Sequence, residues 1–291
     1  MPTVGNKQEV KEHIALTPVL TSPGTAQDGP CIDILMPSYN SGAYLYEAVQ
    51  SALSQMGPRD RLIVQDAVST DNTLEILRRI NDSRLSVISE KDNGQAHALN
   101  LALARSTADW VGWLNADDLY LPGGLSAVRG SMLADCDVVI GDFQLINGDG
   151  RIQSLMKPKL ATLESIIWGR LIPFSGALFV RREFLDSVGS FDPRYNFCMD
   201  YELYLRLWAR PELRVAKVEA YVGALRIYDG TKTASSPWGF VREARRARAT
   251  SMRTWSHRVI GTCATVFHAA LALSGRVRST DVYRRIREHW R

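Results

Sequence analysis

The stretch "DWVGWLNADDLYLPGG", residues 109–124, joins a short apolar run to two adjacent carboxylates. Residues 109–115 are rich in β-forming, apolar side chains, which predicts a strand buried on both faces of a sheet. Asp117 and Asp118 follow this strand directly, where two like charges repel each other unless a cation lies against them. The pair therefore predicts a metal site at a strand end. The alternative is a polar turn that caps the next helix, whose first turn would contain Pro122.

Segments on both sides of this stretch repeat the same pattern. Short apolar segments predict further strands at residues 31–37, 61–67, 85–90 and 136–143, and helical spacing predicts helices at 43–56, 70–80 and 94–106. Alternating strands and helices indicate an α/β domain with a Rossmann-like, mostly parallel sheet flanked by helices.

Polar side chains stand where several of these strands end. Ser38 and Tyr39 follow the first strand, Asp66 ends the second, Asp92 follows the third, and Asp117 and Asp118 follow the fourth. The carboxyl ends of parallel strands meet at one edge of a sheet, and ligands bind there. The sequence therefore predicts one crevice into which these side chains converge.

Composition is that of an ordinary globular protein: 291 residues, of which 45% are hydrophobic and 23% charged. The four cysteines lie far apart, which predicts reduced, mostly buried thiols in a cytosolic protein. Residues 1–30 contain no apolar segment of the kind a secretory signal needs, and we expect them to form a disordered arm.

Five sequence blocks occur in a characteristic order. They read "PSYNSGAYLYEAVQSALSQ", "DAVSTDNTLEIL", "SEKDNGQAHALNLALA", "WLNADDLYLPGGL" and "GSFDPRYNFCMDYELYLRL". Together they resemble family 2 of the nucleotide-diphospho-sugar glycosyltransferases, in the version typical of bacterial enzymes that build exopolysaccharide and other surface glycans. The resemblance covers about residues 31–234, which is the expected domain, and implies a GT-A fold, an inverting hexosyltransferase and dependence on Mg²⁺ or Mn²⁺.

The resemblance also implies roles for single residues on the donor side. Pro37, Ser38 and Tyr39 match the loop that cradles the nucleoside base, Asp66 the acidic residue that contacts the nucleoside, and Asp92 joins the same donor site. Arg226 and Lys232 match positions that touch the diphosphate. Asp118 would ligate the metal that bridges the donor phosphates, and Asp117 would approach the ribose or the water shell of the metal.

Asp200 matches the catalytic base of the family. Such a base must reach the acceptor hydroxyl that attacks the sugar. The alternative is that Asp200 only caps the following helix.

The chain departs from the family pattern at three positions near the expected site. Ala67 stands where many relatives have a second aspartate, and Val68 stands where glycine is usual, so a left-handed turn there would be strained. Tyr228 stands where relatives often have a histidine that could ligate the metal. These departures keep open a degenerate sugar-nucleotide-binding or scaffold protein. A sugar-nucleotide nucleotidyltransferase is a further alternative, although no glycine-rich phosphate loop follows the first strand.

The C-terminal residues 235–291 form a basic, helical extension in this interpretation. From Phe240 to Arg291 the chain has 12 arginines and three acidic residues, whereas the whole chain has a net charge of +4 at pH 7. Residues 259–273 are mostly apolar but shorter than the roughly 20 residues that a membrane span needs.

Two interpretations of this extension remain open. Residues 240–273 could lie on an anionic membrane, so that a cytoplasmic enzyme sits at the inner face of the cell membrane beside a glycan or lipid-linked acceptor. They could instead pack on the body or on a second subunit. No nucleic-acid reader motif accompanies the arginines, so we expect no nucleic-acid partner.

Overall fold

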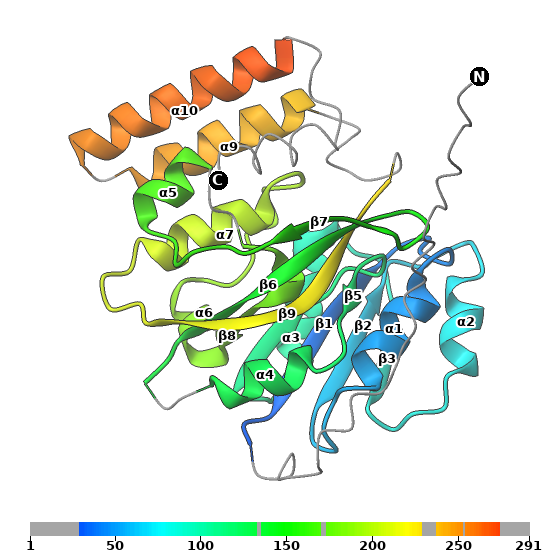
Figure 1. Ribbon diagram of the computed structural model, residues 1–291. Coiled ribbons are helices and arrows are strands. Elements are labelled where there is room, and N and C mark those ends of the chain that lie inside the picture. The colour runs from blue at the N-terminus through cyan, green and yellow to red at the C-terminus, as the bar shows by residue number, and fades with distance from the viewer. Residues whose placement is uncertain (1–28, 133–134, 170–172, 229–236, 253, 274–291) are drawn as a thin grey trace, which may run out of the picture.

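The structure is a computed structural model that describes residues 29–132, 135–169, 173–228, 237–252 and 254–273, with side chains up to residue 270. A curled sheet runs through the body, and helices cover both of its faces (Figure 1). The predicted disordered arm lies almost wholly outside the described residues, and so does Lys232.

One half of the sheet is parallel, in the strand order β3-β2-β1-β4. These strands are β1 (Ile32–Ser38), β2 (Arg61–Asp66), β3 (Leu85–Ser89) and β4 (Trp110–Trp113). The connecting helices are α1 (Leu45–Leu53), α2 (Thr73–Arg79) and α3 (Gln95–Arg105). The predicted strands and helices of this half are confirmed to within a few residues at each end.

The other half of the sheet is mixed, in the order β8-β6-β9-β5 from the edge of β4. The strands are β5 (Leu119–Tyr120), β6 (Val138–Asn147), β7 (Ile152–Met156), β8 (Leu178–Arg181) and β9 (Val215–Ile227). β8 is antiparallel to β4 and β6, β5 is antiparallel to β9, and β6 is parallel to β9. This mixture of directions could not be predicted from local sequence patterns, because strand direction here depends on pairing between distant segments.

The apolar core has one part on each face of the sheet. Ile34 and Met36 of β1 face one part and Leu35 the other, as the two-residue period of a strand requires. Further helices are α4 (Gly124–Gly130), α5 (Leu163–Trp168), α6 (Arg182–Ser187) and α7 (Met199–Trp208). All four cysteines are free thiols; Cys136 and Cys198 are buried, whereas Cys263 is exposed.

Two helices of the C-terminal extension pack on the body. α9 (Pro237–Ser251) lies against α7, and α10 (Trp255–Leu273) lies against α9 and α5 (Figure 1). For α9, packing on the body is therefore what the structure shows. Among the residues that the structure describes, no helix combines the length and apolar character that crossing a bilayer requires.

Candidate active site

The loops that follow β1 and β2 are joined by hydrogen bonds to form one platform. The Asn40 backbone N–H donates to Ser69 Oγ over 2.8 Å, and the Thr70 N–H donates back to Asn40 Oδ1 over 2.9 Å. At Gly42 an added Cβ would lie 1.8 Å from the side-chain oxygen of Asn72, so the close approach of the two loops requires glycine. The platform is thus fixed by contacts within the parallel half.

The predicted nucleoside loop lies at the edge of this platform. Ser38, the last residue of β1, is buried, and within the described part of the chain its Oγ has no hydrogen-bond partner. The Tyr39 side chain is 63% exposed and presents an aromatic face to solvent. A base or another flat group could stack there.

Asp66 is fully buried and shapes the loop after β2. Its carboxylate accepts hydrogen bonds from the Ser69 backbone N–H and from the hydroxyls of Ser69 and Ser89. These bonds hold Val68 at a φ of 62°, a left-handed conformation that is strained for a β-branched side chain. The strain expected from the sequence is present, and the Asp66 side chain points into its own turn.

The paired aspartates lie beyond the end of β4 in different environments. Asp118 is 1% exposed; its Oδ1 accepts the Arg226 backbone N–H over 2.9 Å and its Oδ2 accepts the Asn115 side-chain amide over 3.0 Å. Asp117 is half-buried, and its Oδ2 accepts the Tyr228 hydroxyl over 3.1 Å. Neither residue caps α4, whose N-cap is Gly123. The helix-cap alternative is therefore wrong.

Arg226, at the end of β9, is 2% exposed. Its guanidinium donates to the Asp117 carbonyl over 2.8 Å and to Glu47 over 2.7 Å, and its CZ atom lies 4.4 Å from the centre of the Tyr44 ring. Tyr44 in turn contacts Tyr228, with 5.1 Å between ring centres. These contacts make Arg226 a buried support for the Asp117–Asp118 turn.

The two carboxylates have raised pKa values. Burial raises the pKa of Asp117, and burial together with the nearby Asp117 charge raises the pKa of Asp118. In the described part of the chain, His, Cys, Asp and Glu side chains nowhere gather in threes as a complete metal site. A hard cation such as Mg²⁺ or Mn²⁺ needs only one or two protein carboxylates when phosphates supply further oxygens. The donor set therefore fits such a cation shared with a diphosphate.

The N-terminal residues of α3 lie between the Asp117–Asp118 turn and the segment that leads to Asp200. Gln95 donates from its side-chain amide to Asn115 Oδ1 over 2.7 Å. Gly94 lies close to Asn196, which is four residues before Asp200. A Cβ added to Gly94 would be 3.9 Å from Asn196 Oδ1. Asp92 accepts the Gly94 backbone N–H over 2.8 Å and so shapes the loop that leads into α3.

Asp200 is the second residue of α7, whose N-cap is Cys198. Its Oδ1 accepts the Tyr201 backbone N–H over 2.7 Å, and among the described residues its Oδ2 has no hydrogen-bond partner. The carboxylate is half-buried, and this burial raises its pKa. Asp200 thus bonds one N–H of the helix terminus, as the cap alternative expects, and its other oxygen is available for a further hydrogen bond.

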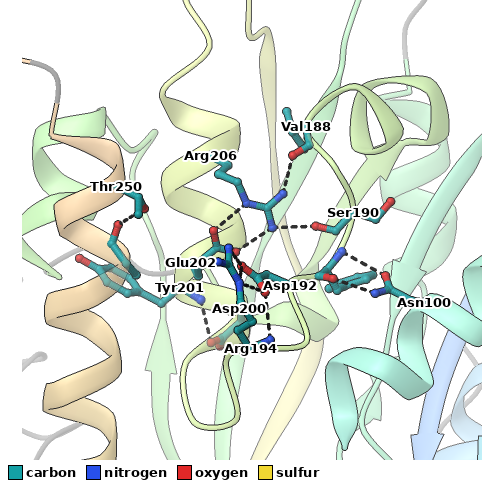
Figure 2. A network of polar contacts seen from close by, with 12 residues as sticks. Asn100, Val188, Ser190, Asp192, Arg194, Asp200, Tyr201, Glu202, Arg206 and Thr250 are labelled. Atoms are coloured by element: carbon teal, nitrogen blue, oxygen red, sulfur yellow. Dashed lines mark hydrogen bonds and ion pairs between the residues drawn. The ribbon is translucent and has the colours of Figure 1, made fainter. Parts of the chain in front are cut away.

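Polar contacts surround the start of α7, as Figure 2 shows. Arg206 pairs with Glu202 one turn away, and its guanidinium donates to the carbonyls of Val188 and Ser190. Asn100 of α3 bonds both the N–H and the carbonyl of Phe191. The loop that leads to Asp200 is thereby tied to α3 and to α7.

A protein-family model described as glycosyl transferase family 2 matches residues 33–189, which is more than half of the chain. The chain belongs to glycosyl transferase family 2. Succinoglycan biosynthesis protein ExoU of Rhizobium meliloti (strain 1021) is 31% identical over 197 residues, which cover 60% of this chain and 56% of that protein.

A second relative has a more specific name. UDP-Glc:alpha-D-GlcNAc-diphosphoundecaprenol beta-1,3-glucosyltransferase WfgD of Escherichia coli is 27% identical over 142 residues, which cover 48% of this chain and 56% of that protein. The chain thus spans little more than half the length of these relatives.

A solved structure confirms the predicted GT-A fold. Mannosyltransferase PcManGT from Pyrobaculum calidifontis, in complex with GDP-Man and Mn²⁺, superposes with a TM-score of 0.62 at 19% identity. The match covers 90% of this chain and 83% of that one. It therefore includes strands and helices beyond the part that the family model matches.

Sequence reasoning missed several residues that build the site. Glu47 of α1 and Tyr44, the N-cap residue of that helix, support Arg226, and Gln95 links α3 to Asn115 beside the paired aspartates. A further carboxylate, Glu243 of α9, accepts backbone N–H groups just before α7. A signal for Glu243 exists, because it is the single acidic residue in the arginine-rich sequence of α9.

Proposed function

We propose that this family 2 protein is an inverting glycosyltransferase. It would transfer a sugar from a nucleotide-diphospho-sugar to an acceptor hydroxyl in the synthesis of a bacterial polysaccharide or glycolipid. The observation that carries the proposal is that α3 is bonded to both regions. Gln95 bonds Asn115 beside the Asp117–Asp118 turn, and Asn100 bonds Phe191 in the segment that leads to Asp200. The turn proposed to bind the donor is thus bonded to α3, and so is the segment that carries Asp200, a partly buried carboxylate whose pKa is raised by burial.

On the donor side the nucleoside would bind over Pro37, Ser38 and Tyr39. The exposed ring of Tyr39 offers a stacking surface, and buried Ser38 offers a hydroxyl that has no partner among the described residues. Asp66 would act indirectly, because its oxygens hold the turn that carries Val68. Asp92 would act in a similar way by fixing the entrance to α3.

The diphosphate would lie over Asp117 and Asp118. These carboxylates would hold Mg²⁺ or Mn²⁺, with Asp117 offering the more open oxygen and Asp118 fixed by Asn115 and Arg226. A cation bound there neutralises the charge that develops on the departing nucleoside diphosphate. Arg226 would support this site from behind through its contact with the Asp117 carbonyl. Lys232 stays a prediction for the diphosphate.

Asp200 would remove the proton from the acceptor hydroxyl as that oxygen attacks the anomeric carbon from the face opposite the leaving group. This displacement inverts the configuration at the anomeric carbon in a single step. The base needs an oxygen within hydrogen-bond reach of the hydroxyl, and Oδ2 of Asp200 has no competing partner among the described residues. Its raised pKa also makes it a better proton acceptor than an exposed aspartate.

The test is nucleoside diphosphate release from UDP-, GDP- and dTDP-sugars, with and without Mn²⁺, in the presence of a polyprenyl-diphosphate-linked sugar acceptor. WfgD, whose name specifies a diphosphoundecaprenol-linked acceptor, motivates that choice. We expect acceptor-dependent release and a product of inverted anomeric configuration. Binding of a sugar nucleotide without release would support the degenerate binding protein. Release of a sugar phosphate or formation of a sugar nucleotide would support the nucleotidyltransferase.

We also propose that α10 attaches the enzyme to the anionic inner face of the cell membrane. Its outward side carries exposed Trp255, Val259 and Val266, and exposed Arg258 lies on the same helix. Such a face suits a helix that lies in a membrane interface. We expect the protein to sediment with phosphatidylglycerol vesicles at low salt, and we expect Val266→Ser to weaken this sedimentation. No sedimentation would leave α10 as a packing element.

A further inference from the structure

α9 contacts the segment that carries Asp200 along one side of the helix. The guanidinium of Arg246 lies over the ring of Tyr195, with CZ 4.8 Å from the ring centre. Ala244 and Ala247 of α9 are buried in the same apolar cluster as Cys198. α9 is distant in sequence from the segment that carries Asp200, and it covers one side of that segment.

Glu243 of α9 holds this segment just before Asp200. Its carboxylate accepts the backbone N–H groups of Asn196, Phe197 and Cys198 at 2.8 to 3.2 Å, and it is 9% exposed. Cys198 is the N-cap of α7, and its own side chain makes no capping bond. A carboxylate is stabilised at a helix N-terminus, because its charge opposes the positive end of the helix dipole and its bonds to N–H groups are charge-assisted.

Arg248 of α9 holds the same segment just after Asp200. It is 2% exposed, and its Nε donates to the Tyr201 hydroxyl over 2.8 Å and to the Ile167 carbonyl over 2.9 Å. His268 of α10 lies 2.9 Å from Arg248 through Nδ1. Burial and the Arg248 charge lower the pKa of His268 to about 4, so it is neutral near pH 7 and its Nδ1 can accept from Arg248.

Asp200 lies between these two attachments. The one hydrogen bond that the structure gives its carboxylate comes from the next backbone N–H, so its direction follows the backbone of residues 196–201. That backbone is held by Glu243 on one side and through the Tyr201 side chain on the other. Displacements of about 1 Å at a reacting group can cost on the order of 100-fold in rate.

We infer that Glu243 and Arg248 are positioning residues for the catalytic base, so that α9 is a working part of the transferase site. This inference rests on the proposed function. It goes beyond the family match, which ends at residue 189, well before α7 and α9.

The experiment compares Glu243→Ala, Glu243→Gln and Arg248→Lys in the full chain, with Arg245→Ala on the exposed side of α9 as the matched control. Thermal unfolding gives the folded fraction, and nucleoside diphosphate release gives kcat and the donor KM per folded molecule. We expect Glu243→Ala to lower kcat at least tenfold with a donor KM within about twofold of wild type. Glu243→Gln should lose less, because its amide oxygen still accepts N–H groups. Arg248→Lys should lower kcat, because a lysine ammonium cannot keep the bonds to Tyr201 and Ile167 together with those to α10.

A folded Glu243→Ala protein with wild-type kcat would overturn the inference and leave Glu243 with a structural role only. If that variant does not fold, the same comparison with Glu243→Gln decides. An active wild type with unaffected variants contradicts the positioning role alone. A wild type without turnover on any donor contradicts the proposed function and removes the positioning role with it.

Discussion

The donor side and the base side of this site are held in different ways. On the donor side the loops after β1 and β2 bond each other, as Asn40 does with Ser69. On the base side the residues before Asp200 are bonded by Glu243, which belongs to the C-terminal extension. The family match at residues 33–189 contains the whole platform but neither Asp200 nor α9. The platform is thus a property of the family domain, whereas the proposed base, Asp200, depends on the later part of the chain.

The carboxylates on the two sides also differ in hydrogen bonding and in accessibility. Asp118 has both oxygens bonded and is almost inaccessible, whereas Asp200 has an oxygen without a partner among the described residues. Substitution of Asp118 should therefore lower stability in addition to weakening the proposed cation site, whereas substitution of Asp200 should mainly affect turnover.

The largest effect is expected for Asp200→Asn. The amide keeps the shape and the oxygen that accepts the Tyr201 N–H, but it cannot take a proton. We expect turnover to fall by roughly two to four orders of magnitude, while donor affinity measured by calorimetry stays unchanged. Wild-type turnover by the folded variant would show that Asp200 is a helix-terminal residue only.

The pH dependence of turnover should report the same group. Because burial raises the pKa of Asp200, the base becomes protonated at a higher pH than an exposed aspartate does. Turnover should fall about tenfold per pH unit once the pH is below that value. The negative groups that flank the segment are Glu202, paired with Arg206, and Glu243, bonded to backbone N–H groups.

The free energy of unfolding should fall as the pH rises, whereas turnover should rise. The folded chain binds the Asp200 proton more tightly than the unfolded chain, so ionisation costs stability as the pH rises through the folded pKa. Asp200→Asn should therefore gain stability relative to wild type between acidic and neutral pH. A constant difference in chemical denaturation across that range would contradict the raised pKa.

A medium effect is expected for Asp118→Ala. The change leaves the Arg226 N–H and the Asn115 amide without their partner, which costs about 1–3 kcal/mol for buried groups. Asp117→Ala is the matched control; this half-buried neighbour should lose no more than about 0.5 kcal/mol. Urea denaturation of both variants measures the difference, and equal losses would show that Asp118 is not the support for this turn.

The smallest effect is expected for Val68→Gly. Glycine removes the strain of the left-handed φ but costs chain entropy, so we expect a net gain of about 1 kcal/mol. Ala67→Gly, at a neighbouring position without a positive φ, should instead lose about 0.5–1 kcal/mol. If both variants lose stability in urea denaturation, the contacts of the Val68 side chain stabilise the fold by more than the backbone strain costs.

The donor side could be predicted from the sequence, because its strands and turns have local sequence patterns. Buried strands of the parallel half are recognised by apolar runs, and polar residues such as Asp66 and Asp117 follow directly where those strands end. The left-handed turn at Val68 could be expected because glycine is usual at that position in relatives.

The sequence was insufficient where a side chain finds its partner far along the chain. Arg226 matches a diphosphate contact, yet the fold places Glu47 and the Asp117 carbonyl against it. Glu243 meets residues 196–198, and no periodicity relates the two segments. The same holds for the antiparallel β8, which is inserted between β4 and β6 by pairing alone.

Amide hydrogen exchange of wild type and Glu243→Ala tests most directly whether the donor side holds itself while α9 holds the base side. In Glu243→Ala we expect the amides of residues 196–198 to exchange faster, because they lose their acceptor. The amides of Asn40 and Thr70, which are bonded within the platform, should keep their wild-type rates. Equal acceleration on both sides, or none at residues 196–198, would contradict the account.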